Sequence, residues 1–262
     1  MPNKLSLNSI LNDKVSGSSE LLKNINCYLL QNITKPGRIK KDIITLKERL
    51  SQFSAINNYT TKVEKLLAQG DAKELKSLLK GFNKEKDFSY RKIFENAKKY
   101  LTKLNNVLTL SNSKTLLEVF KLWHKENKNL KITVSESRPK NEGIIFAKAL
   151  AKAGIKVEVI TDASINSFIE KTDAVIIGAD KILRNRNVVN KIGSRSAAII
   201  CRHFRKPFYV LTTGDKFTAD IHYKQTSEDP ADILKTKENK LKVYNYYFEE
   251  IENSLITKII TD

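Results

Sequence analysis

The sequence predicts an α/β protein, with a helical domain over residues 1–105 and a Rossmann-like domain, built on a doubly wound parallel sheet, over residues 106–262. In the first part, apolar residues recur at steps of three and four, the spacing of helices that bury one face. From Val107 onward, short apolar runs alternate with segments of helical spacing. Strands that alternate with helices are typical of a parallel sheet covered by helices on both faces.

The helical part contains four apolar stripes that we expect to form a core. Ser18 and Ser19 offer N-caps for the first helix, and Pro36-Gly37 breaks the chain before a long helical segment. Asp71 is placed to cap a short helix that ends at Gly81, and a further helix follows. The stripes run over residues 21–29, 39–53, 75–79 and 93–104.

Five strands are expected in the second part, joined by helices. The fourth is a continuous apolar run, as in a parallel strand buried on both faces. The strands are 107–110, 131–135, 155–160, 175–177 and 207–211, and the helices are 113–126, 142–153, 162–171 and 195–205. The tail from Thr218 is partly irregular, and we expect its segments 243–249 and 255–261 to pack against the domain or form an interface.

The composition excludes several classes of protein. No apolar run approaches the roughly 20 residues of a membrane span, and the start of the chain lacks a secretory apolar region. Cys27 and Cys201 lie far apart in different predicted helices, so no disulfide framework is expected. The three histidines are scattered, and no CxxC, HExxH or Walker lysine loop occurs. We therefore expect a cytoplasmic protein with no metal and no cofactor.

The formal net charge of +18 raises the question of a nucleic-acid partner. Most of this charge is lysine interspersed with glutamate on helical segments, which is typical of solvated helix faces. No RNA-binding aromatic motif or zinc finger is present. A weak affinity for nucleic acid stays open, while the clustered basic residues favour a phosphorylated small-molecule ligand.

Polar residues follow the predicted strands where their carboxyl ends meet at one edge of the sheet, the place where open α/β sheets bind ligands. Asp180 follows the fourth strand, and Asn190 and Lys191 reach the same edge through the turn before the helix at Arg195. Helix N-termini after Ser113 and Ser194 are expected to point backbone N–H groups there, an arrangement that suits a phosphate. The other candidates are Ser111, Ser113, Lys114, Arg138 and Lys216.

Each candidate also has an ordinary structural explanation. Ser111 and Ser113 could cap a helix, Arg138 could pair with Glu136, and Lys216 could be a solvated loop lysine. Their joint placement at strand ends is what favours a site.

An ordered set of motifs gives the chain a specific resemblance. It resembles the translation initiation factor 2B alpha/beta/delta family, whose superfamily includes methylthioribose-1-phosphate and ribose-1,5-bisphosphate isomerases. The resemblance covers nearly the whole chain and implies a helical N-terminal domain, a Rossmann-like domain, and a homodimer or an assembly with related subunits. The motifs are residues 16–20 (SGSSE), 108–113 (LTLSNS), 136–139 (ESRP), 142–143 (EG), 178–180 (GAD), 190–193 (NKIG), 244–249 (YNYYFE) and 255–261 (LITKIIT).

The resemblance also implies roles for individual residues. Asp180 stands at the acid/base aspartate of the isomerases, and Ser111 stands where they have a cysteine. Their N-terminal loop carries an arginine-glycine pair, which is replaced here by Ser16-Gly17. The implied ligand-binding positions are Gly17, Ser18, Ser113, Lys114, Arg138, Asn190, Lys191 and Lys216.

These replacements bear on mechanism. A cysteine, with a reference pKa of about 8.5, ionises near neutral pH, whereas a serine hydroxyl needs an adjacent base. We therefore expect a non-catalytic subunit-like protein with a retained sugar-phosphate or nucleotide pocket and a regulatory or translation-related role. The alternative is an aldose–ketose isomerase in which Asp180 is the acid/base and Ser111 only positions the substrate.

Overall fold

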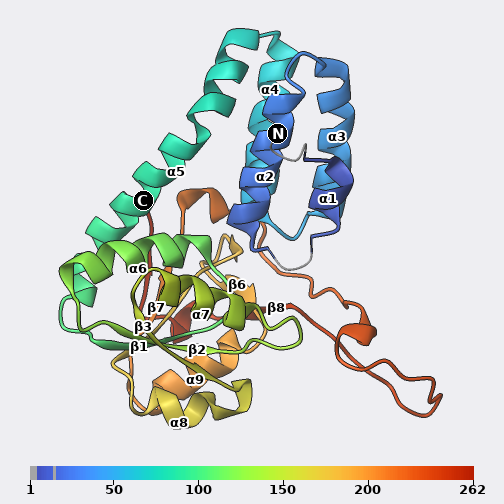
Figure 1. Ribbon diagram of the computed structural model, residues 1–262. Coiled ribbons are helices and arrows are strands. Elements are labelled where there is room, and N and C mark those ends of the chain that lie inside the picture. Colours follow the sequence, from blue (N-terminus) through green and yellow to red (C-terminus); the bar gives the residue numbers. More distant parts are fainter. Residues whose placement is uncertain (1–4, 14–15) are drawn as a thin grey trace.

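The computed structural model describes residues 5–13 and 16–262, and it contains a helical bundle above an α/β domain (Figure 1). Helices α1 to α4 form the bundle, and α5 runs slantwise from the bundle to the α/β domain. The helices are α1 (Leu7–Leu11), α2 (Ser18–Gln31), α3 (Pro36–Arg49), α4 (Ser54–Gln69), α5 (Ala72–Leu101), α6 (Lys114–Glu126), α7 (Glu142–Lys152), α8 (Ile165–Ile169) and α9 (Ser194–His203).

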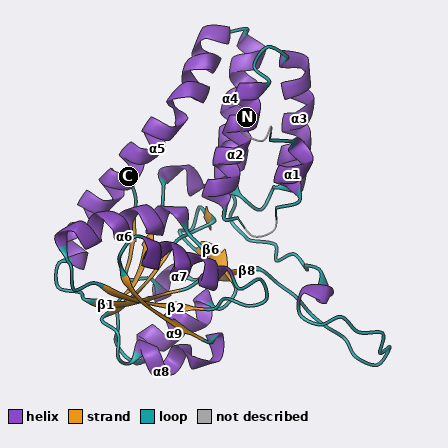
Figure 2. Cartoon of the chain, viewed as in Figure 1, coloured by secondary structure: helices purple, strands orange, loops and turns teal. Residues whose placement is uncertain are grey.

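The α/β domain is built on a six-stranded, entirely parallel sheet with the order β3-β2-β1-β4-β7-β9 (Figure 2). One face packs against α6, α7 and the end of α5, and the other packs against α8 and α9. This confirms the predicted fold class. The strands are β1 (Asn106–Thr109), β2 (Lys131–Ser135), β3 (Lys156–Ile160), β4 (Ala174–Ile177), β7 (Phe208–Leu211) and β9 (Lys258–Ile260).

Helix α5 joins the two cores. Its 30 residues run through Gly81 without a break, so the helix end predicted at Gly81 is wrong. Leu75 and Phe82 pack in the bundle core, whereas Ile93 and Leu101 pack against the sheet. A glycine inside a helix costs about 1 kcal/mol relative to alanine but does not end the helix when packing on both sides continues.

A second, antiparallel sheet with the order β5-β6-β8 was not predicted. The expected turn at Asn190 and Lys191 is instead the end of β6 (Val188–Lys191), which pairs with β5 (Lys181–Ile182) and β8 (Phe248–Ile251). The tail segments expected to pack or form an interface contribute β8 and β9, and β9 extends the main sheet beyond the predicted five strands. Whether such short strands form depends on pairing with segments far away in the sequence, so local periodicity alone is a weak signal for them.

The strand order fixes where a ligand can sit. From β1 the chain moves outward through β2 and β3, then returns to place β4 on the other side of β1. The crevice at the carboxyl ends of β1 and β4 is therefore the switch point at which doubly wound sheets bind ligands. None of the helices among the described residues is long and apolar enough to cross a membrane.

Candidate functional site between the two domains

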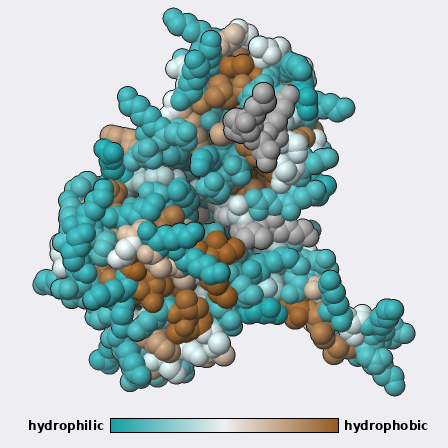
Figure 3. All heavy atoms as spheres, in the orientation of Figure 1, coloured by the Kyte–Doolittle hydropathy of each residue, from teal (hydrophilic) through white to brown (hydrophobic). Residues whose placement is uncertain are grey.

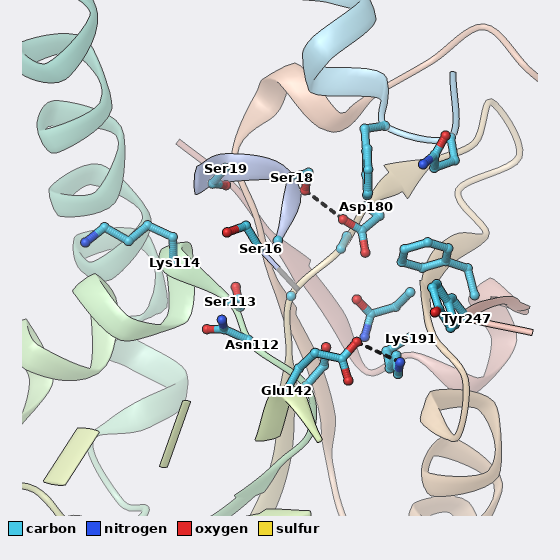
Figure 4. A pocket seen from close by; sticks show the side chains of 18 of the residues that line it. Ser16, Ser18, Ser19, Asn112, Ser113, Lys114, Glu142, Asp180, Lys191 and Tyr247 are labelled. Carbon is cyan, nitrogen blue, oxygen red and sulfur yellow. Dashed lines mark hydrogen bonds and ion pairs between the residues drawn. The ribbon is translucent and has the colours of Figure 1, made fainter. Parts of the chain in front are cut away.

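A cavity of about 420 Å³ opens at the switch point between β1 and β4 (Figure 4). The helical bundle covers it through the loop before α2 and through the end of α3, while the α/β domain supplies the floor. Nine of the ten predicted site residues line it: Gly17, Ser18, Ser111, Ser113, Lys114, Asp180, Asn190, Lys191 and Lys216. The tenth, Arg138, is exposed and is not among the lining residues.

Ser18 connects the two domains at the cavity. It is the first residue of α2, and its hydroxyl donates a 2.7 Å hydrogen bond to Asp180 Oδ1. Ser18 Oγ itself accepts a hydrogen bond from the Lys216 ammonium group, which is buried. The bundle therefore holds Asp180 in place, and Lys216 reaches Asp180 through a serine rather than pointing freely at a ligand.

The turn Gly214–Lys216 is tied to the bundle from several sides. Lys86 of α5 forms an ion pair with Asp215, and the Asn58 side chain of α4 donates to the Asp215 carbonyl at 2.8 Å. Burial would raise the pKa of Asp215, but Lys86 and Lys216 outweigh it and hold that pKa below its usual value. Burial lowers the pKa of Lys216, against the opposite effect of Asp180 and Asp215.

Lys191 is paired at the base of the cavity. Its side chain is 2% exposed, and its ammonium group lies 2.8 Å from Glu142 Oε1. The Tyr247 ring lies 4.8 Å from the same nitrogen, at a distance where a cation is attracted to an aromatic face. The other Glu142 oxygen, Oε2, is buried without a hydrogen-bond partner among the described residues. Lys191 is thus largely neutralised, which limits what it can offer an anion.

Two glycines allow the polar segments to approach one another. A Cβ on Gly17 would lie 2.8 Å from the Asn112 carbonyl oxygen, and a Cβ on Gly178 would lie 2.8 Å from Ser113 Oγ. Both contacts are too short for a side chain. Glycine at these positions lets the loop before α2 and the end of β4 close onto the turn after β1.

The turn after β1 carries three of the predicted residues. Ser111 has a positive φ of 66° and donates its backbone N–H to Ser137 Oγ at 2.7 Å. Ser113 is the N-cap of α6 and accepts from the Leu116 N–H. Lys114 pairs with Glu118 at 2.7 Å, and Figure 4 shows its ammonium group turned away from Asp180. Lys114 and Thr115, the first residues of α6, line the cavity, and their backbone N–H groups have no hydrogen-bond acceptor among the described residues.

The expected anion site at the second helix N-terminus is occupied by the protein itself. Glu249 of β8 accepts the Arg195 N–H at 2.9 Å, and the Gly193 and Ser194 N–H groups also lower its pKa. Burial nevertheless raises the pKa of Glu249 overall. Asn190 donates to Ser194 Oγ at 2.9 Å and so fixes the turn before α9. The prediction that this terminus faces the ligand edge with free N–H groups is wrong, because β8 supplies a carboxylate that local sequence does not reveal.

Arg138 and Asp162 have structural roles. The backbone N–H groups of Ser137 and Arg138 bond to the two carboxylate oxygens of Asp162, at 2.8 and 2.7 Å. This pairing ties the ends of β2 and β3 together and leaves the Arg138 guanidinium in solvent.

Sequence reasoning missed other lining residues, above all Arg49 at the end of α3. Arg49 is exposed, and no ion pair involves it among the described residues. Local sequence offers little indication of this position, since a basic residue in the last turn of a helix is common and needs no functional explanation. Among the described residues the charged lining is balanced: the four basic residues are Arg49, Lys114, Lys191 and Lys216, and the four acidic ones are Asp13, Glu142, Asp180 and Glu228.

A balanced lining fits a ligand that carries both a phosphate and hydroxyl groups, because cations and N–H groups hold the phosphate while carboxylates accept from hydroxyls. A cavity of this size lies within the range of small-molecule sites. In the described part of the chain, no group of three or more His, Cys, Asp or Glu residues could hold a metal ion.

Comparison with known proteins agrees with this architecture. The model of the initiation factor 2 subunit family, IF-2B, matches residues 39–262. The chain belongs to this family. A ribose 1,5-bisphosphate isomerase from Methanocaldococcus jannaschii is 32% identical over 164 residues, which are 60% of this chain and 53% of that protein. The chain thus matches about half the length of that relative.

Other members of the family carry translation-factor names. A putative translation initiation factor eIF-2B subunit 2-like protein from Pyrococcus furiosus is 28% identical over 85% of this chain and 80% of its own length. The crystal structure of eIF-2B from Pyrococcus horikoshii OT3 has a TM-score of 0.81, 24% identity, and coverage of 97% of this chain and 93% of that one. The tetrameric eIF2B-beta2-delta2 complex from C. thermophilum gives a TM-score of 0.69 at 18% identity, covering 97% and 86%. These two likenesses concern the fold.

Proposed function

We propose that this chain is a non-catalytic member of the IF-2B family that binds a phosphorylated sugar or a nucleotide in the cavity between its domains. The observation that carries the proposal is the environment of Ser111. No histidine is among the residues described as lining the cavity, and Asp180 accepts from Ser18. A serine without an adjacent base is a weak nucleophile and a weak acid.

The ligand class follows from the groups that remain available. Arg49 and the N–H groups at the start of α6 can bind a phosphate, while Lys114, Lys191 and Lys216 already have partners. Asp180 Oδ2 has no hydrogen bond among the described residues and can accept from a ligand hydroxyl. A sugar phosphate or nucleoside monophosphate contains both groups.

A thermal-shift panel tests this proposal. Ribose 5-phosphate, ribose 1,5-bisphosphate, methylthioribose 1-phosphate and AMP are compared with ribose and inorganic phosphate. A ligand at 100 times its dissociation constant should stabilise the protein by about 2.7 kcal/mol. Arg49→Ala should weaken the shift, whereas Arg202→Ala on α9, outside the cavity lining, should not. If none of the phosphorylated compounds raises the melting temperature, the proposal is wrong.

The second candidate is an active aldose–ketose isomerase. Support comes from the relatives named as ribose 1,5-bisphosphate isomerase and from the hydrogen-bonded chain of Lys216, Ser18 and Asp180. In that case Asp180 moves the proton and Ser111 positions the substrate. Turnover that disappears in Asp180→Asn would establish it, and equal inertness of the two proteins would rule it out.

We further propose that the chain forms a homodimer or assembles with related subunits through the α/β domain, in a regulatory or translation-related role. The likeness to subunits of a tetrameric complex supports this. Analytical ultracentrifugation should give twice the 29.9 kDa of one chain, and a single-chain mass at micromolar concentration would contradict the homodimer.

A further inference from the structure

The outer face of α5 carries a row of cations around one aromatic ring. We call it the α5 basic face. Its residues all lie on the helix that spans both domains, and all are exposed: Lys73, Lys76, Lys80, Lys84, Phe88 and Arg91. At 1.5 Å per residue, the row from Lys73 to Arg91 extends over about 27 Å. In Figure 3 the outer side of this helix is mostly hydrophilic.

In the part of the chain that the structure describes, these cations have no carboxylate partners. None of the five forms an ion pair with any described residue. Elsewhere in the chain an exposed lysine does pair, as Lys23 pairs with Glu20 at 3.5 Å. By the helical repeat of 100° per residue, Glu74 and Glu85 lie about 100° and 120° around α5 from the centre of the row, and between Lys73 and Arg91 Asp87 is the acidic residue on the same side as the row.

The spacing within the row works against helix stability. Lys76, Lys80 and Lys84 follow one another at i, i+4, where like charges repel and destabilise a helix. A glutamate at Lys80 would relieve the repulsion on both sides. A local arrangement that weakens the fold and is not offset by a stabilising contact is a sign of function.

Phe88 gives the row a second property. It is 66% exposed, and Lys84 and Arg91 are its neighbours at i−4 and i+3, with Lys92 at i+4. A ring on a basic surface can stack on a nucleobase while the cations contact phosphates, the combination that binds single-stranded nucleic acid. The grouping of this ring with cations at i−4, i+3 and i+4 is what favours a nucleic acid as the partner.

We propose that the α5 basic face binds single-stranded RNA through its backbone, with Phe88 stacking on a base. The surface is separate from the cavity and does not depend on the cavity's ligand. None of its residues lines the cavity.

Fluorescence anisotropy with a labelled oligouridylate tests the proposal on the full chain. The variant Lys76→Ala/Lys80→Ala/Lys84→Ala keeps good helix formers at all three positions. Loss of three phosphate contacts should lower the slope of log K against log salt by about 2, between about 50 and 200 mM salt. Phe88→Ala should weaken binding about 5- to 100-fold and leave that slope unchanged.

A matched control removes the same charge elsewhere. Lys235→Ala/Lys237→Ala/Lys240→Ala lies on the exposed segment between η3 (Pro230–Asp232) and β8, and it should change affinity by less than about twofold. Equal losses in the two triple variants mean attraction by total charge and overturn the proposal. An unchanged affinity in Phe88→Ala, or no binding by the wild type at low salt, would also overturn the proposal. A polyglutamate peptide that competes as well as RNA would overturn it too and would identify an acidic protein as the class of partner.

Discussion

The hydroxyl of Ser18 donates a 2.7 Å hydrogen bond to Asp180 Oδ1 across 162 positions of the sequence. Ser18 begins α2 in the bundle, and Asp180 follows β4 at the switch point of the sheet. Lys216 donates to the same hydroxyl from the other side. The orientation of the cavity's central carboxylate therefore depends on how the bundle sits on the α/β domain.

Ser18→Ala should lower the free energy of unfolding by about 1–3 kcal/mol, because it leaves the buried Lys216 ammonium without its hydrogen-bond acceptor. Urea unfolding followed by circular dichroism measures this. Ser19→Ala, beside it in the cavity lining, should change stability by less than about 0.5 kcal/mol. Similar values for both variants would show that the Ser18 hydrogen bonds contribute nothing specific.

The Glu142–Lys191 pair should show strong coupling. Glu142→Leu leaves a buried ammonium unpaired and should cost about 3–5 kcal/mol, while Glu142→Leu/Lys191→Met should cost much less than the sum of its single changes. A double-mutant cycle by urea unfolding measures the coupling. The exposed pair Lys47–Glu64 is the control and should couple by less than about 1 kcal/mol. Additive effects at Glu142 and Lys191 would contradict the pairing.

Asp215 should contribute to acid sensitivity. Its pKa in the folded protein lies below the usual 3.8, chiefly because Lys86 and Lys216 outweigh the effect of burial. The folded state therefore binds fewer protons than the unfolded state in this range, so Asp215 stabilises the fold above about pH 4, and this contribution is lost as pH falls below 3.8.

The measurement is urea unfolding of wild type and Asp215→Asn from pH 7 down to acid. Their difference in stability should be largest near neutrality and should shrink in acid, and Lys86→Met should reduce the difference near neutrality. A difference that is constant or grows as pH falls would show that the pKa of Asp215 is not lowered.

Gly81→Ala should stabilise the protein by about 0.5–1 kcal/mol, because Gly81 lies inside α5 and a Cβ there meets nothing within 4 Å. Thermal unfolding of the two proteins measures this. Gly70 is the control, since its φ of +70° makes Gly70→Ala destabilising. A loss of stability in Gly81→Ala would instead support a helix that ends at Gly81.

The sequence was sufficient where local pattern and packing agree. The apolar run at Val175 marked a central strand, and the order of strands and helices led to a doubly wound sheet with Asp180 at its switch point. The sequence was insufficient where contacts with distant segments determine what a residue binds. Glu249 covers the N-terminus of α9 from 54 positions away, and Glu142 pairs with Lys191 across 49 positions. Arg138 was expected in the cavity because it follows a strand. Its backbone N–H instead bonds to Asp162, and its side chain lies outside the cavity lining.

The central claim is that the cavity binds a phosphorylated sugar without converting it. Phosphorus NMR of ribose 1,5-bisphosphate mixed with the wild-type protein tests binding and turnover in one sample. The account predicts that the phosphate signals shift or broaden with protein concentration and that no new signal accumulates. Unperturbed signals would contradict binding, and a product signal that disappears in Asp180→Asn would contradict the absence of catalysis.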